Sequence, residues 1–214
     1  MARFEGALAV ALPGHPDGAP LDGTRAMADW VIAEVEDVPG PLVMVGHSLG
    51  GAVALEVALA RADLVAGLVL VSTGARLPVP DDALTRLDHD FAGECARLVE
   101  QSWLYHDADL IRRGTNSVIS MGPAALRADY LAARGHDLRG GLGGLDMPAL
   151  VVSGDSDPLV PTWLSEELAD ELPDATLAII AGAAHVPQLE RSDAVDLLVA
   201  AFLARLEQSL ADDP

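Results

Sequence analysis

The chain has 214 residues, of which 50% are hydrophobic and only 4% aromatic, so we expect one domain with an interior of alanine, valine and leucine. Its 33 acidic and 13 basic residues give a net charge of −20, which argues against nucleic acid and anionic membranes as partners. Every basic residue is an arginine, which excludes chemistry that depends on lysine, such as Schiff-base formation.

The cysteine content and the apolar runs bear on the cellular compartment. The single cysteine, Cys95, cannot form an internal disulfide and is expected to be a small buried residue. No apolar run reaches the length of about 18 residues that a membrane span needs. The first six residues, Met-Ala-Arg-Phe-Glu-Gly, include an acidic residue where a signal peptide requires apolar ones. These features favour a cytoplasmic protein.

Short apolar runs alternate with helical segments in the first third of the chain. The run over 7–12 is typical of a strand buried on both faces, and a proline- and glycine-rich loop follows over 13–18. This alternation predicts right-handed crossovers and a parallel sheet. The expected elements, in order, are a strand over 7–12, a helix over about 22–37, a strand over 42–46, a helix through about 61 and a strand over 66–72.

The alternation stops over residues 76–146. Helical stretches are expected around 82–104 and 123–134, followed by a glycine-rich segment over 139–144, and no strand is expected. We interpret this region as a helical lid inserted over the sheet; the alternative is that these helices belong to the main core. The sheet pattern then returns, with a strand over 148–153, a helix from about 162, a strand over 176–180 and a helix over about 192–210.

The sequence Gly46-His47-Ser48-Leu49-Gly50 matches the pattern G-x-S-x-G between an expected strand and an expected helix. A serine on a sharp strand-to-helix turn needs neighbours without bulky Cβ substituents, and the two glycines leave that room. The helix that follows directs its unpaired N–H groups and the positive end of its dipole at the serine. The pattern therefore predicts a nucleophilic Ser48.

Two further candidates follow strands later in the chain. Asp157, or its neighbour Asp155, comes after the strand over 148–153, and His185 comes after the strand over 176–180. In open parallel sheets, active groups gather at the carboxyl ends of the strands. A serine hydroxyl becomes a good nucleophile when an imidazole accepts its proton and a carboxylate orients that imidazole. The order serine, aspartate, histidine is the order found with this turn.

On these residues the sequence resembles the α/β-hydrolases. Gly46-His47-Ser48-Leu49-Gly50-Gly51 resembles the family's nucleophile elbow, and the segments 151–161 and 183–190 resemble its acid loop and histidine loop. The resemblance implies an α/β fold, a mostly parallel sheet with helices on both faces, in which Asp157 is the acid. It also implies that the Leu49 N–H contributes to an oxyanion hole.

The resemblance has a departure at its N-terminal end. The loop over 13–18 resembles the family's D-x-P-G-H-G loop, which follows the fourth strand, although Ala11 and Pro16 replace an aspartate and a glycine. Three earlier strands, and a His-Gly loop that supplies half of the oxyanion hole, are not found upstream. Either the chain is a fragment or a mis-started reading frame, or the strand over 7–12 pairs directly with the strand over 42–46.

The remaining polar residues have structural interpretations. Asp155 is expected to accept hydrogen bonds from loop backbone, His47 to shape the elbow and His15 to fix its own loop. No spacing of histidine and acidic residues indicates a metal site. His89, His106 and His136, in the expected lid, are predicted to be ordinary surface residues.

Together these features predict a serine hydrolase that cleaves an ester or related acyl bond of an uncharged or weakly charged small molecule through an acyl-enzyme. Ser48 is the expected nucleophile, His185 the base and Asp157 the orienting acid, and no cofactor is implied. Two alternatives stay open: a C–C hydrolase, thioesterase or lyase with the same triad, and a non-catalytic protein with an incomplete oxyanion hole. The sequence leaves the oligomeric state open, and a homo-oligomer is one of the alternatives.

Overall fold

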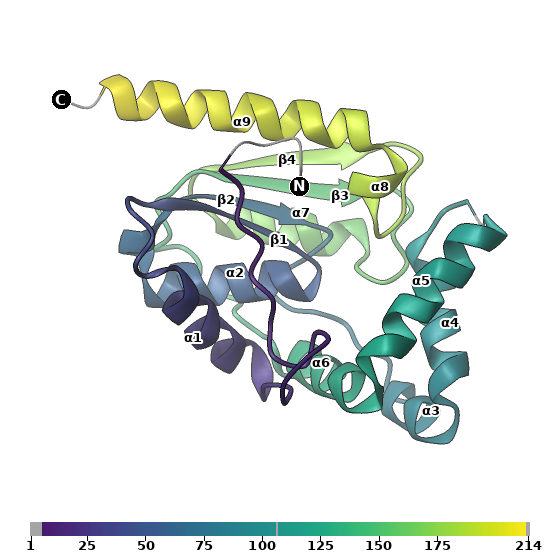
Figure 1. The fold of residues 1–214 in the computed structure, drawn as a ribbon. Helices are drawn as coiled ribbons and strands as arrows, with labels where there is room; N and C mark the ends of the chain where they lie inside the picture. The colour runs from purple at the N-terminus through teal and green to yellow at the C-terminus, as the bar shows by residue number, and fades with distance from the viewer. Residues whose placement is uncertain (1–5, 106, 213–214) are drawn as a thin grey trace.

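Four parallel strands form a sheet at the centre of the molecule, in the order β1–β2–β3–β4 (Figure 1). The structure is a computed structural model, and it describes residues 6–105 and 107–212. Each adjacent pair is parallel, as the alternation of strands and helices predicts. The strands are β1 (Leu42–His47), β2 (Val65–Val71), β3 (Ala149–Gly154) and β4 (Ala175–Ile180).

Helices cover both faces of the sheet (Figure 1). On one face, α1 (Gly23–Val35), α2 (Leu49–Ala60) and α7 (Thr162–Glu171) share a buried apolar cluster with β1, β2 and β3. On the other face, α9 (Ser192–Asp212) buries Val195, Val199, Phe202 and Leu206 against β2 and β3. Within the described residues, no helix is both long and apolar enough to cross a membrane.

The expected strand over 7–12 is wrong. These residues are irregular, and β1 pairs with β2 alone among the described strands. Val10 and Leu12 pack against the main core, whereas Leu8 is 61% exposed. The run is apolar enough for a buried strand, but its backbone forms no ladder with any of the described strands. The alternative in which it pairs with the elbow strand is therefore excluded.

Within the described residues, four α-helices and no strand follow β2 and precede β3 along the chain, and helices without a strand were expected here (Figure 1). The last of them also packs against α1 and α2, and its Ala132 belongs to the main core. The two ends of this segment are joined, because the Leu138 N–H donates to the carbonyl of Ala75 at 2.7 Å. The helices are α3 (Ala83–His89), α4 (Phe91–Ser102), α5 (Ala108–Met121) and α6 (Pro123–Gly135).

A buried carboxylate joins three of these helices. Glu94 of α4 is 2% exposed and accepts hydrogen bonds from Arg86 of α3, Arg97 of α4 and Tyr130 of α6. Although burial raises the pKa of Glu94, these three donors outweigh it and lower the pKa to about 2. Cys95 beside it is buried and free, as predicted.

Candidate active site

Ser48 lies on a strained turn between β1 and α2. Its φ of 52° and ψ of −120° place a non-glycine residue in the left-handed half of backbone space, which is costly and is found mainly at functional positions. Gly46 allows the turn, since a Cβ there would lie 2.3 Å from the carbonyl oxygen of Gly50. Gly50 itself faces open space, so only the first of these two glycines is needed for the close approach.

The first turn of α2 surrounds the backbone of this serine. The N–H groups of Gly51 and Ala52 donate to the Ser48 carbonyl at 2.9 and 3.2 Å. Leu49 is the first residue of the helix, where an N–H has no partner within the helix. Its N–H therefore remains a candidate donor to a developing oxyanion.

Asp157 and His185, which follow different strands, form a buried pair. The carboxylate oxygen Oδ2 of Asp157 lies 2.8 Å from Nδ1 of His185, and both residues are 6% exposed. The other oxygen, Oδ1, accepts the backbone N–H groups of Leu159 and Val160, each at 2.9 Å. With both oxygens engaged, the carboxylate is fixed, and it can hold His185 in the tautomer with a proton on Nδ1.

Asp155 is bonded in a different way. Its Oδ1 accepts the Gly182 N–H at 3.0 Å and the Ser156 hydroxyl at 2.9 Å. These bonds lower the pKa of Asp155, which lies on the exposed surface of the loop. The geometry therefore puts Asp157, and not Asp155, beside His185.

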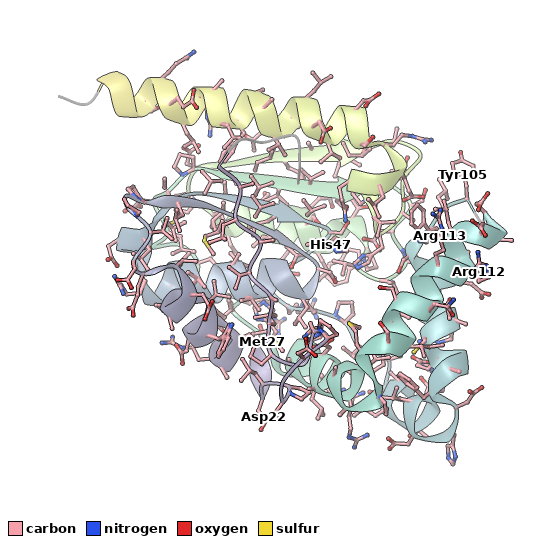
Figure 2. The ribbon with its side chains drawn as sticks, viewed as in Figure 1. Asp22, Met27, His47, Tyr105, Arg112 and Arg113 are labelled. Atoms are coloured by element: carbon pink, nitrogen blue, oxygen red, sulfur yellow. The ribbon has the colours of Figure 1, made fainter. Side chains whose placement is uncertain are left out.

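His47, labelled in Figure 2, is the residue before Ser48, and its side chain contacts His185. Its Nε2–H donates to the backbone carbonyl of His185 at 2.7 Å, and the two ring centroids lie 4.7 Å apart. Burial and the neighbouring His185 lower the pKa of His47 to about 4, so the ring is neutral near pH 7. The residue before Ser48 thus contacts His185, which brings the serine turn and the Asp157–His185 pair to one edge of the sheet.

The other histidines lie in structural contacts or on the surface. His15 Nε2 lies 2.9 Å from Oδ2 of Asp129 in α6, which ties the loop over 13–18 to that helix. The N–H of Gly14 and the N–H of His15 both donate within this loop, so neither is available as an oxyanion donor. His89 is exposed as predicted, and His106 lies outside the described residues.

The surface prediction for His136 is wrong. His136 is 2% exposed, and its Nε2–H donates to the Gly74 carbonyl at 3.3 Å. It directly follows α6, where the segment over 136–138 meets the residues that leave β2. The sequence around a histidine that follows a helix does not indicate whether its side chain is buried or exposed. The burial of His136 follows from its contact with Gly74, which is distant in the sequence.

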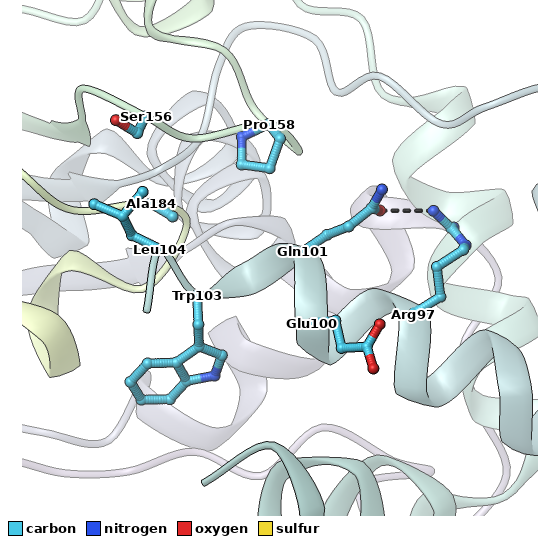
Figure 3. Close-up of a pocket in the computed structure, with 8 residues that line it drawn as sticks. All are labelled: Arg97, Glu100, Gln101, Trp103, Leu104, Ser156, Pro158 and Ala184. Atoms are coloured by element: carbon cyan, nitrogen blue, oxygen red, sulfur yellow. Dashed lines mark hydrogen bonds between the residues drawn. The ribbon is translucent and has the colours of Figure 1, made fainter. Parts of the chain in front are cut away.

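A pocket of about 380 Å³ adjoins the acid and histidine loops (Figure 3). Pro158 and Ala184, the neighbours of Asp157 and His185, line one side of it. Residues of α4 and the two that follow it, Trp103 and Leu104, also line the pocket. The end of α4 therefore lies directly against the two loops that carry the Asp157–His185 pair.

Comparisons with known proteins agree with this arrangement. A family model described as the alpha/beta hydrolase family matches residues 2–198. A pimeloyl-[acyl-carrier protein] methyl ester esterase from Neisseria meningitidis serogroup C is 34% identical, over 91% of this chain and 82% of the relative. The esterase of the same name from Serratia marcescens is 28% identical, over 91% of this chain and 82% of the relative.

Solved structures show the same fold. A thermophilic esterase superimposes with a TM-score of 0.83 at 27% identity, covering 91% of this chain and 79% of that one. An esterase from Exiguobacterium antarcticum has a TM-score of 0.86 at 17% identity, covering 92% of this chain and 80% of that one. With its parallel sheet, its serine turn and these relatives, the chain belongs to the α/β-hydrolase family and is an ester-hydrolysing enzyme.

Proposed function

We propose that Ser48, His185 and Asp157 form the catalytic triad of this esterase. The observation that carries the proposal is the buried 2.8 Å contact between Asp157 Oδ2 and His185 Nδ1; the residue before Ser48, His47, bonds to the His185 carbonyl, and Ser48 lies on a strained turn. Ser48 Oγ attacks the acyl carbon while His185 takes its proton. His185 then returns the proton to the leaving alcohol, and a water activated by His185 releases the acid from the acyl-enzyme.

The oxyanion of each tetrahedral intermediate is bound by the Leu49 N–H at the start of α2, helped by the positive end of the helix dipole. Among the described residues, the Leu49 N–H is the one donor that we propose, because the Gly14 and His15 N–H groups of the loop over 13–18 are bonded to nearby carbonyls of the same segment. Loss of one donor from a two-donor hole costs about 10²–10³ in rate. We therefore expect a slower esterase than one with both donors.

The curated relatives suggest the substrate class. They are named for the methyl ester of a pimeloyl group on acyl carrier protein, and they match over nine-tenths of this chain. We infer that the substrate is a small alkyl ester, such as a methyl ester, of an acyl chain. We further propose that α3–α6 act as a lid over the sheet. The cytoplasmic location stays a prediction from the composition.

The test is hydrolysis of matched esters by the wild type and by Ser48→Ala. Pimeloyl-[acyl-carrier protein] methyl ester, free dimethyl pimelate and p-nitrophenyl butyrate are each followed by release of alcohol. We expect hydrolysis of a methyl ester by the wild type, and a loss of several orders of magnitude in Ser48→Ala, since the triad acts as a unit. Equal rates in the two proteins would refute the triad, and a wild type that hydrolyses p-nitrophenyl butyrate but releases no methanol from either methyl ester would refute the substrate class.

A further inference from the structure

The backbone around His185 is held from several sides. The His185 N–H donates to the carbonyl of Ser102 at 3.1 Å, and the His185 carbonyl accepts Nε2–H of His47 at 2.7 Å. The preceding N–H, on Ala184, donates to Oε2 of Glu190 at 2.7 Å. Ser102 lies outside the sequence motifs, and Glu190, the last residue of the segment 183–190, was given no role by them.

Glu190 has a second bond that leads away from the histidine loop. Its other oxygen, Oε1, accepts the N–H of Leu104 at 2.7 Å, from the residues that follow α4. Figure 3 shows Leu104 beside Ala184, the two residues whose N–H groups this carboxylate binds. Arg191, the next residue, lies over the ring of Tyr105 with 5.7 Å between the guanidinium carbon and the ring centroid.

We propose that Glu190 is a positioning residue, which fixes His185 by binding the histidine loop and the end of α4 together. The inference rests on the proposed function, in which His185 is the base. A carboxylate that accepts two backbone N–H groups forms two charge-assisted bonds, which are stronger than neutral ones. The end of α4 also contacts His185 directly, because the Ser102 carbonyl accepts the His185 N–H, so the helix and the base are linked both directly and through Glu190.

The chemistry explains why this position requires a carboxylate. Both oxygens of Glu190 face N–H donors, so a glutamine would turn its NH₂ group toward one of them and lose that bond. Asp155 gives a matched control on the neighbouring acid loop, because its bonds to the Ser156 hydroxyl and the Gly182 N–H both go to Oδ1. An asparagine there can keep its oxygen in place and retain both hydrogen bonds, although without the charge.

The test compares Glu190→Gln, Glu190→Asp and Asp155→Asn with the wild type. Glu190→Asp keeps the charge but is one methylene too short to reach both donors. We expect kcat to fall about 10- to 100-fold in both Glu190 variants with KM within threefold, since small displacements of a catalytic group have effects of this size. Asp155→Asn should stay within threefold of the wild type. The low-field proton resonance of the His185 Nδ1–H, bonded to Asp157, should weaken in the Glu190 variants only.

The outcomes separate this inference from the proposed function. Folded Glu190 variants that keep kcat within threefold and an unchanged low-field resonance would overturn the inference. So would an equal loss in Asp155→Asn, or a change in KM alone, since either would indicate a general effect on the loop or on binding. If Glu190→Gln does not fold, Glu190→Asp decides. Full activity of Ser48→Ala would instead refute the triad itself.

Discussion

Replacement of Asp157 by asparagine tests the role of the buried pair with little change in shape. Oδ1 accepts two backbone N–H groups, from Leu159 and Val160, so the amide oxygen of the asparagine must stay at that position. The amide NH₂ then faces Nδ1 of His185, which can only accept from it. His185 is forced into the tautomer with its proton on Nε2, and that nitrogen can no longer take the proton of Ser48.

The expected loss is about 10⁴-fold in kcat, equivalent to about 5 kcal/mol of transition-state stabilisation. The two backbone bonds are kept, so the melting temperature should change little. Steady-state hydrolysis of an ester is measured for Asp157→Asn and Asp155→Asn, with circular dichroism to verify folding. A folded Asp157→Asn within tenfold of the wild type, or a larger loss in Asp155→Asn, would refute this reasoning.

Three further predictions follow from single contacts. Gly46→Ala should abolish folding or activity, because its Cβ would lie 2.3 Å from a backbone oxygen. Gly50→Ala should fold and raise the melting temperature, since nothing lies within 4 Å of that Cβ and alanine favours the helix. The pKa of His47 is lowered to about 4 in the folded protein, so the unfolded chain binds more protons between pH 6.5 and 4. As the pH falls through this range, the free energy of unfolding of the wild type, measured with urea, should fall by up to about 3 kcal/mol more than that of His47→Gln. The same pH dependence in both proteins would contradict this. Glu94→Ala should lower the free energy of unfolding by about 1–3 kcal/mol, because Tyr130 and two arginines lose their shared acceptor, and an unchanged urea midpoint would contradict the network.

Much of the fold could be predicted from the sequence, because strands buried in a parallel sheet are continuous apolar runs. That rule identified β1, β2, β3 and β4. It failed over 7–12, since an apolar run forms a strand only where a neighbouring strand can pair with it. The search for helical patterns did not predict α5, although Asp107 caps that helix by accepting two N–H groups of its first turn.

The candidate site was predictable where its residues follow strands in a fixed order. Ser48, Asp157 and His185 each lie just after a strand, and parallel strands bring their carboxyl ends to one edge. The bond of Glu190 to Leu104 could not be predicted, because it joins residues 86 positions apart and depends on how α4 packs. Contacts of this kind depend on tertiary packing, which no local pattern encodes.

The central claim is that Ser48 is an activated nucleophile. Its most direct test is labelling with a fluorophosphonate probe, followed by mass spectrometry of the labelled peptide, because the probe reports an activated serine whatever the natural substrate. The account predicts one label, on Ser48, that is absent from Ser48→Ala and strongly reduced in Asp157→Asn. A label on another serine, or labelling that persists in Ser48→Ala, would contradict it.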